Sequence, residues 1–187
     1  VSAAKKGFSA GQIALAADIS REEVLRRLEE EDYSTGYREV DGCAGEFPSG
    51  SGYYYGVAGV KDDPYERHSG GIAVIGSGAI RIAQGVEFDY CCVKAVEALR
   101  RRGIRAIMMN VNPETVSTDH DISDALYLEP LTVDDALPVL KREEAAGVFA
   151  CFGGQTSLRL GLDLAQEGIK LFGPGAEVID AAEDRGK

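Results

Sequence analysis

Hydrophobic residues follow helical spacing near the start of the chain and then lose it. Residues 9–17 predict a short helix, and residues 20–31 predict a second one with an apolar stripe along one side. Ser20 and Glu23 form the pattern of a capping box at the start of the second helix. From 32 to 71 the periodicity fades into a stretch rich in Gly, Ser, Pro and Tyr. We therefore expect a small helical segment followed by an irregular linker.

From Ile72 onward, short apolar runs alternate with longer amphipathic segments. Glycine follows two of the amphipathic segments, and Pro138 lies inside a third. Strands are expected at 72–75, 106–111, 126–128, 148–152 and 171–173, and helices at 88–102, 132–144 and 157–167. This alternation predicts an α/β fold, a Rossmann-like parallel sheet with helices on both faces. Loops rich in glycine and polar residues follow Ile75, Val111 and Phe152. Because the carboxyl ends of parallel strands share one edge, that edge is the expected ligand site.

The first of these loops begins like a dinucleotide-binding fingerprint. Gly76 and Gly78 allow a tight turn that brings backbone N–H groups close to a ligand. A dinucleotide site also needs a third glycine, where this chain has Arg81, and an acidic residue after the second strand, where it has Asn110 and Asn112. Both requirements fail, which argues against NAD or FAD.

Arg81 allows two interpretations. Its guanidinium group suits a small oxyanion such as a carboxylate or a phosphate. The other interpretation, which the sequence alone favours, is a surface arginine paired with Glu87 or Asp89, an arrangement that carries no function.

The second loop, 112–121, begins with an Asn-Pro turn. Glu114 and Asp119 could hold a cation or ammonium, and the loop's hydroxyl groups could donate to an anion. The alternative is a hydrogen-bonded connection without a ligand, in which His120 is a solvated loop residue.

The third loop opens a predicted helix. The residues concerned are Gly153, Gly154, Gln155 and Thr156. The free N–H groups at the start of a helix favour an anion, although a Gly-Gly pair is also a common strand-to-helix turn.

Composition narrows the function classes. A formal charge of -11 over 187 residues argues against nucleic-acid binding. No apolar run approaches membrane-spanning length, and no secretory signal is recognisable. The four cysteines show no CxxC spacing, so a zinc site is not expected, and reduced thiols in a cytoplasmic compartment are the simplest interpretation. No nucleophile–base pair and no Walker A motif is visible, so no catalytic residue is predicted in this piece.

Together, the motifs resemble the large subunit of carbamoyl-phosphate synthase, in its second, carbamate-phosphorylating half. The Cys-Cys pair and the glutamate of the NPET motif resemble the second half more than the first. The matching segments are RIAQGVEFDYCCV at 81–93, NPETVSTD at 112–119, GGQT at 153–156, AEDR at 182–185, and VDGCAGEF and YYY at 40–47 and 53–55.

The resemblance implies two domains and a shared activity. Residues 1–69 would be the C-terminal part of a helical oligomerisation domain with its linker, and residues 70–187 a pre-ATP-grasp Rossmann-like domain. The family is a cytoplasmic ligase of arginine or pyrimidine biosynthesis, which makes carbamoyl phosphate from bicarbonate, glutamine-derived ammonia and ATP. Implied partners are the ATP-grasp domain, which binds ATP with Mg or Mn, a glutamine amidotransferase small subunit, and further copies of the chain. We expect the chain alone to be inactive.

The resemblance also assigns residues to a passage for ammonia and carbamate inside the protein. Arg81, Gly85, Glu87 and Glu114 look like residues that line it. The family usually has glycine where this chain has Ala83, and the added methyl group narrows the expected bore. The alternative function is a stand-alone Rossmann-like module that binds a small anion or a nucleotide without catalysis.

Overall fold

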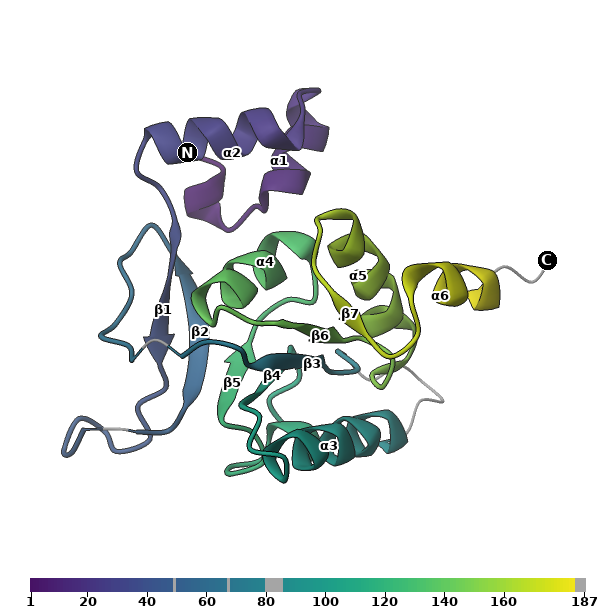
Figure 1. Cartoon of the computed structure of the whole chain (residues 1–187). Coiled ribbons are helices and arrows are strands. Elements are labelled where there is room, and N and C mark those ends of the chain that lie inside the picture. The colour runs from purple at the N-terminus through teal and green to yellow at the C-terminus, as the bar shows by residue number, and fades with distance from the viewer. Residues whose placement is uncertain (49, 67, 80–85, 184–187) are drawn as a thin grey trace.

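The computed structural model describes residues 1–48, 50–66, 68–79 and 86–183. Figure 1 shows a single sheet flanked by helices, with the two N-terminal helices to one side of it. The helices are η1 (Ala4–Lys6), α1 (Ala10–Ala17), α2 (Arg21–Glu30), α3 (Glu87–Arg100), η2 (Val116–Thr118), α4 (Val133–Arg142), α5 (Gly154–Gln166) and α6 (Ala176–Glu183). The strands are β1 (Thr35–Glu39), β2 (Tyr53–Ala58), β3 (Ile72–Ile75), β4 (Ala106–Asn110), β5 (Ala125–Leu128), β6 (Gly147–Phe149) and β7 (Leu171–Phe172). The helices and strands predicted from the periodicity are all present, with ends that differ by a few residues.

The strands form a 7-stranded sheet in the order β1-β2-β5-β4-β3-β6-β7. Every neighbouring pair is parallel except β1 with β2. The predicted Rossmann-like α/β class is therefore confirmed.

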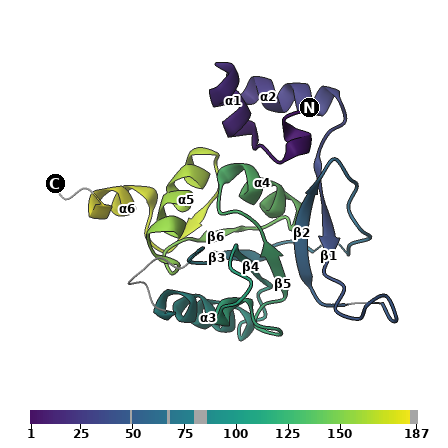
Figure 2. The same ribbon diagram turned by 180° about the vertical axis from the view of Figure 1, so that it is seen from behind.

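Helices cover both faces of the sheet. Figures 1 and 2 show α4 and α5 on one face and α3 on the other. Successive side chains of a strand point to opposite faces, so Ile75 of β3 packs in the core beneath α4 and α5, whereas Val74 packs in the core beneath α3. Because both faces are covered, β3 and β4 are buried along their whole length and show no polar alternation.

The linker expected to be irregular contains two strands, and that part of the prediction is wrong. β1 and β2 pair with each other, and β2 also joins β5 through Tyr53 and Tyr54. The ring of Tyr54 stacks on Tyr127 at 5.1 Å, so this half-buried tyrosine packs against the core, whereas Tyr55 is exposed. The boundary between residues 69 and 70 remains a prediction.

The N-terminal helices form a small cluster of their own around Ala10, Ala14 and Val24. Ser20 caps α2 by accepting a hydrogen bond from the Glu23 N–H, which is one half of the predicted capping box. The Glu23 carboxylate instead pairs with Arg26 and Arg27. Figures 1 and 2 place these helices beside α4.

Candidate functional site

Three loops meet at the carboxyl edge of the sheet, as the sequence predicts. β4, β3 and β6 are adjacent and parallel, so the loops that follow them start side by side. A Cβ atom added at Gly153 would lie 2.4 Å from the carbonyl oxygen of Gly76. The first and third loops are therefore in backbone contact, which only glycine permits here.

The Gly76–Gly78 turn directs its N–H groups toward the protein. Gly76 donates to the Met109 carbonyl at 2.8 Å. Ser77 donates to the Asp89 carboxylate at 3.3 Å, and Gly78 donates to the Asn110 side-chain oxygen at 3.1 Å. This arrangement favours a structural role for the glycine turn over an anion cradle, because the donors already have internal acceptors.

Asp89 and Asn110 are the centre of a buried polar network. Their side chains belong to residues that are 1% and 0% exposed. Asn110 donates to Asp89 at 3.3 Å and to the Ser117 hydroxyl at 3.1 Å. Ser117 itself donates to the Oδ1 atom of Asp89 at 3.3 Å, which is also the atom that accepts from Asn110. Thr115 donates to the Oδ2 atom of Asp89 at 2.5 Å. The Asp89 carboxylate is thus held by neutral donors from three segments, which offsets the cost of burying its charge.

The hydroxyl groups of the second loop serve this network and the loop itself. Thr118 donates to the carbonyls of Asn112 and Thr115 at 3.2 and 3.0 Å. The Asn112 side-chain oxygen accepts from the Glu114 N–H at 3.0 Å, and Glu114 is exposed. The hydroxyl groups of the second loop thus have partners within the protein, whereas the Glu114 carboxylate is free to face a ligand, so both interpretations of this loop stay open. Asp119 and His120 are exposed.

Glu87 is an exposed residue at the start of α3, two positions before the buried Asp89. Arg81 and Gly85, together with Ala83, lie outside the described residues. The two candidate passage residues that can be placed are therefore Glu87 and Glu114, both exposed at the same edge.

The third loop is a tight strand-to-helix turn. Gly154 has a φ of 76°, and a Cβ atom there would lie 3.6 Å from the Phe88 ring of α3. No side chain caps the amino end of α5, which begins at Gly154. Gln155 is exposed and Thr156 half-buried. The turn and the anion-facing interpretations are both compatible with this geometry.

Sequence reasoning missed Glu129, which directly follows β5. It is 7% exposed and accepts a hydrogen bond from the Gly56 N–H of β2. Burial, opposed by that hydrogen bond and assisted by the charge of Asp135, raises the pKa of Glu129 to about 7. A glutamate immediately after an apolar strand was the available signal.

A second buried polar cluster lies near the amino edge of the sheet. Glu143, 0% exposed, accepts from Tyr127 at 2.7 Å and from Arg105 at 3.1 Å, and it also accepts from Tyr65. Beside it, the Arg142 guanidinium lies 4.0 Å from the Tyr65 ring centre.

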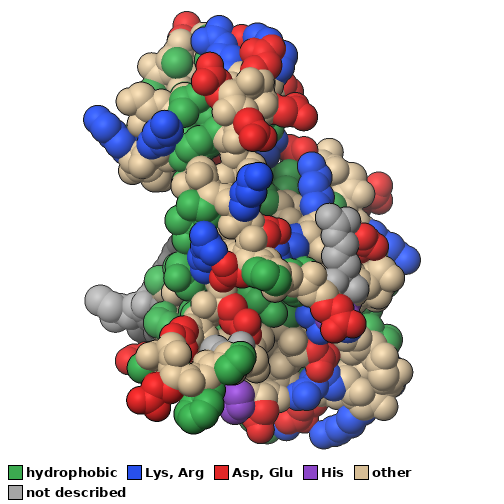
Figure 3. All heavy atoms as spheres, turned by 90° about the vertical axis from the view of Figure 1, so that its left-hand side faces the viewer, with side chains coloured by type: hydrophobic (Ala, Val, Ile, Leu, Met, Phe, Trp, Pro, Cys, Tyr) green, Lys and Arg blue, Asp and Glu red, His purple; other side chains and the backbone are tan. Residues whose placement is uncertain are grey.

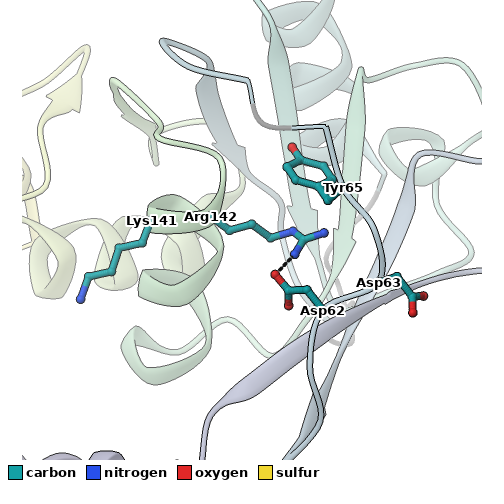
Figure 4. A pocket seen from close by; sticks show the side chains of 5 residues that line it. All are labelled: Asp62, Asp63, Tyr65, Lys141 and Arg142. Carbon is teal, nitrogen blue, oxygen red and sulfur yellow. Dashed lines mark hydrogen bonds and ion pairs between the residues drawn. The ribbon is translucent and has the colours of Figure 1, made fainter.

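A cavity of about 300 Å³ adjoins this cluster. Figure 4 shows Arg142 bonded to Asp62 beneath Tyr65, with Lys141 directed away. Burial and the Glu143 hydrogen bond raise the pKa of Tyr65 to about 12. The cluster fastens the segment before β3 to α4, which is a structural role.

Acidic and basic side chains are interspersed on the face shown in Figure 3. Within the described ranges, no group of three or more His, Cys, Asp or Glu side chains is placed to hold a metal ion. Among the helices described, none is long and apolar enough to cross a membrane.

Comparison with known proteins gives consistent matches. The model of the carbamoyl phosphate synthase preATP-grasp domain matches residues 68–181. The carbamoyl phosphate synthase large chain of Methanothermobacter thermautotrophicus is 44% identical over 183 residues, which are 98% of this chain and 17% of that protein. The large chain of Thermoanaerobacter sp. (strain X514) is 45% identical over 99% of this chain and 17% of its own length. That of Gemmatimonas aurantiaca is 51% identical over 80% of this chain and 14% of its own length. The chain thus spans less than a fifth of these relatives.

Proposed function

The chain belongs to the carbamoyl phosphate synthase pre-ATP-grasp family, and from that premise we propose that it is part of the large subunit of a glutamine-dependent carbamoyl-phosphate synthase. The piece belongs to the second, carbamate-phosphorylating half of that subunit. The full protein forms carbamoyl phosphate from bicarbonate, glutamine-derived ammonia and ATP. ATP with Mg or Mn is bound by the ATP-grasp domain, and a glutamine amidotransferase small subunit supplies the ammonia. The large-chain relatives support this proposal, although they name neither the nitrogen donor nor the half.

Within that enzyme, the chain supplies part of the wall of an internal passage for ammonia and carbamate. Arg81 attracts carbamate by charge, Gly85 keeps the bore open, and Glu87 and Glu114 accept hydrogen bonds from ammonia or ammonium. The observation that supports this role is the position of Glu87 and Glu114. Both are exposed at the carboxyl edge, on segments joined directly by the Thr115–Asp89 hydrogen bond.

The test is the coupling between glutamine hydrolysis and product formation in the full enzyme. Gly85→Phe should fill the bore, so glutamine hydrolysis continues while carbamoyl phosphate formation falls. The matched control is Gly42→Phe, because Gly42 is exposed and a Cβ atom there meets nothing within 4 Å. Unchanged coupling in Gly85→Phe would mean that the passage assignment is wrong.

The alternative, a stand-alone module for a small anion or a nucleotide, makes a different prediction. It requires ligand binding by the isolated chain, whereas the proposed role predicts that the isolated chain neither hydrolyses ATP nor forms carbamoyl phosphate. The internal acceptors of the Gly76–Gly78 turn speak against an anion at that loop. Calorimetric titration with ADP and with NADH separates the two, since saturable binding of either ligand would favour the module.

A further inference from the structure

The buried carboxylate of Asp89 connects the two segments that carry the exposed carboxylates of the edge. Along α3, Asp89 follows Glu87 by two positions, within the same helical turn. Across space, its Oδ2 accepts from the hydroxyl of Thr115 at 2.5 Å, and Thr115 is the residue directly after Glu114. One hydrogen bond therefore connects the turn that carries Glu87 to the loop that carries Glu114.

The network resists movement of either segment. Oδ1 of Asp89 accepts from Ser117 in η2 and from Asn110 at the end of β4. Both oxygens are thus occupied by donors from the second loop or its preceding strand. Asp89 and Thr115 are 1% and 7% exposed, so water does not compete freely for these bonds.

From this arrangement we propose that Asp89 is a positioning residue, which holds Glu87 and Glu114 at a fixed separation through its bond to Thr115. The inference rests on the proposed function, because a fixed separation matters only if both carboxylates line the passage. Asp89 itself touches no substrate. Loss of the bond lets the loop shift relative to α3, and small displacements of aligned groups have large kinetic effects.

The experiment uses the full enzyme with its glutamine-hydrolysing subunit, and it measures glutamine consumed per carbamoyl phosphate formed. Thr115→Val removes the hydroxyl at nearly constant volume, and we expect this ratio to rise about threefold or more. Thr115→Ser keeps the hydroxyl and should stay near the wild-type ratio. Asp89→Asn should also raise the ratio. If that variant does not fold, the two Thr115 variants decide the question.

The matched control is Thr132→Val. Thr132 also donates its hydroxyl to an aspartate, Asp135, at the start of a helix, but that helix is α4, on the opposite face of the sheet from α3. It should lower the unfolding temperature and leave the ratio unchanged.

Two outcomes overturn the proposal. If Thr115→Val lowers the unfolding temperature but keeps the wild-type ratio while Gly85→Phe uncouples the enzyme, Asp89 is only structural and the passage assignment survives. If Gly85→Phe, Glu87→Gln and Glu114→Gln all leave the ratio unchanged, the passage assignment fails and the positioning role fails with it. A raised ratio in Thr115→Val that Thr115→Ser restores supports the proposal.

Discussion

Replacing Glu129 by glutamine should make the chain more stable at high pH and should change its stability little at low pH. Glutamine keeps the shape of the side chain and the acceptor for the Gly56 N–H. It removes the carboxyl group whose pKa is raised from 4.5 to about 7 by burial. Between these two values the folded protein retains a proton that the unfolded chain has lost, so wild-type stability falls as the pH rises.

The magnitude follows from the two pKa values. At about 1.4 kcal/mol per pH unit, ionisation of Glu129 costs about 3 kcal/mol once the pH exceeds both values. About 2.5 kcal/mol of this is lost between about pH 5 and about pH 8. For a chain of this length, that free energy corresponds to an unfolding temperature difference of about 5–10 °C.

The assay is thermal unfolding of the wild type and of Glu129→Gln at about pH 5 and about pH 8, followed by circular dichroism. Other titrating groups are common to both proteins, so the difference between them isolates Glu129. Glu31→Gln is the matched control, because Glu31 is an exposed glutamate after α2. If the gain in stability of Glu129→Gln is the same at both pH values, the buried carboxyl does not titrate as described and the reasoning is wrong.

Three further perturbations test other parts of the structure. Gly153→Ala would place a methyl group 2.4 Å from a backbone oxygen of the first loop, so urea unfolding should show a loss of about 3 kcal/mol; an unchanged midpoint would refute this close contact. Asp134 accepts from the N–H of Gly11 at 2.7 Å and pairs with Arg21. Burial raises the pKa of Asp134, but these two hydrogen bonds outweigh burial and hold that pKa below its usual value. Asp134→Ala should therefore release the N-terminal helices and speed their cleavage by trypsin, and an unchanged cleavage rate would show that the contact does not hold them. Burial, with the nearby charge of Asp89, raises the pKa of the Cys92 thiol, so this cysteine should react with a thiol reagent only on unfolding, whereas rapid labelling in the native chain would contradict its burial.

The central sheet could be predicted from the sequence because its pattern is local. Apolar runs such as 72–75 are buried on both faces, and the helices between them show helical periodicity and glycine stops. β1 and β2 could not be predicted in this way. β2 joins the sheet by pairing with β5, and the paired residues Tyr53 and Leu126 are about 70 positions apart in the sequence. The periodicity of a single sequence carries no information about such a distant partner.

The candidate site, too, could be predicted only in part from the sequence. The loops and their shared edge follow from the strand order, so Gly76, Gly153 and the second loop could be found from the sequence. The role of Asp89 could not, because a surface ion pair and a buried network give the same residue pattern. Only the approach of Thr115, 26 positions further along, distinguishes them.

The most direct test of the central claim is the retention of nitrogen inside the full enzyme. Glutamine labelled with ¹⁵N on its amide is supplied together with excess unlabelled ammonium, and the label in the carbamoyl phosphate formed is measured by mass spectrometry. A closed passage predicts that the wild type and Gly42→Phe retain nearly all of the label, whereas Gly85→Phe loses it to the external pool. Full retention in Gly85→Phe at an undiminished rate of product formation would contradict the account.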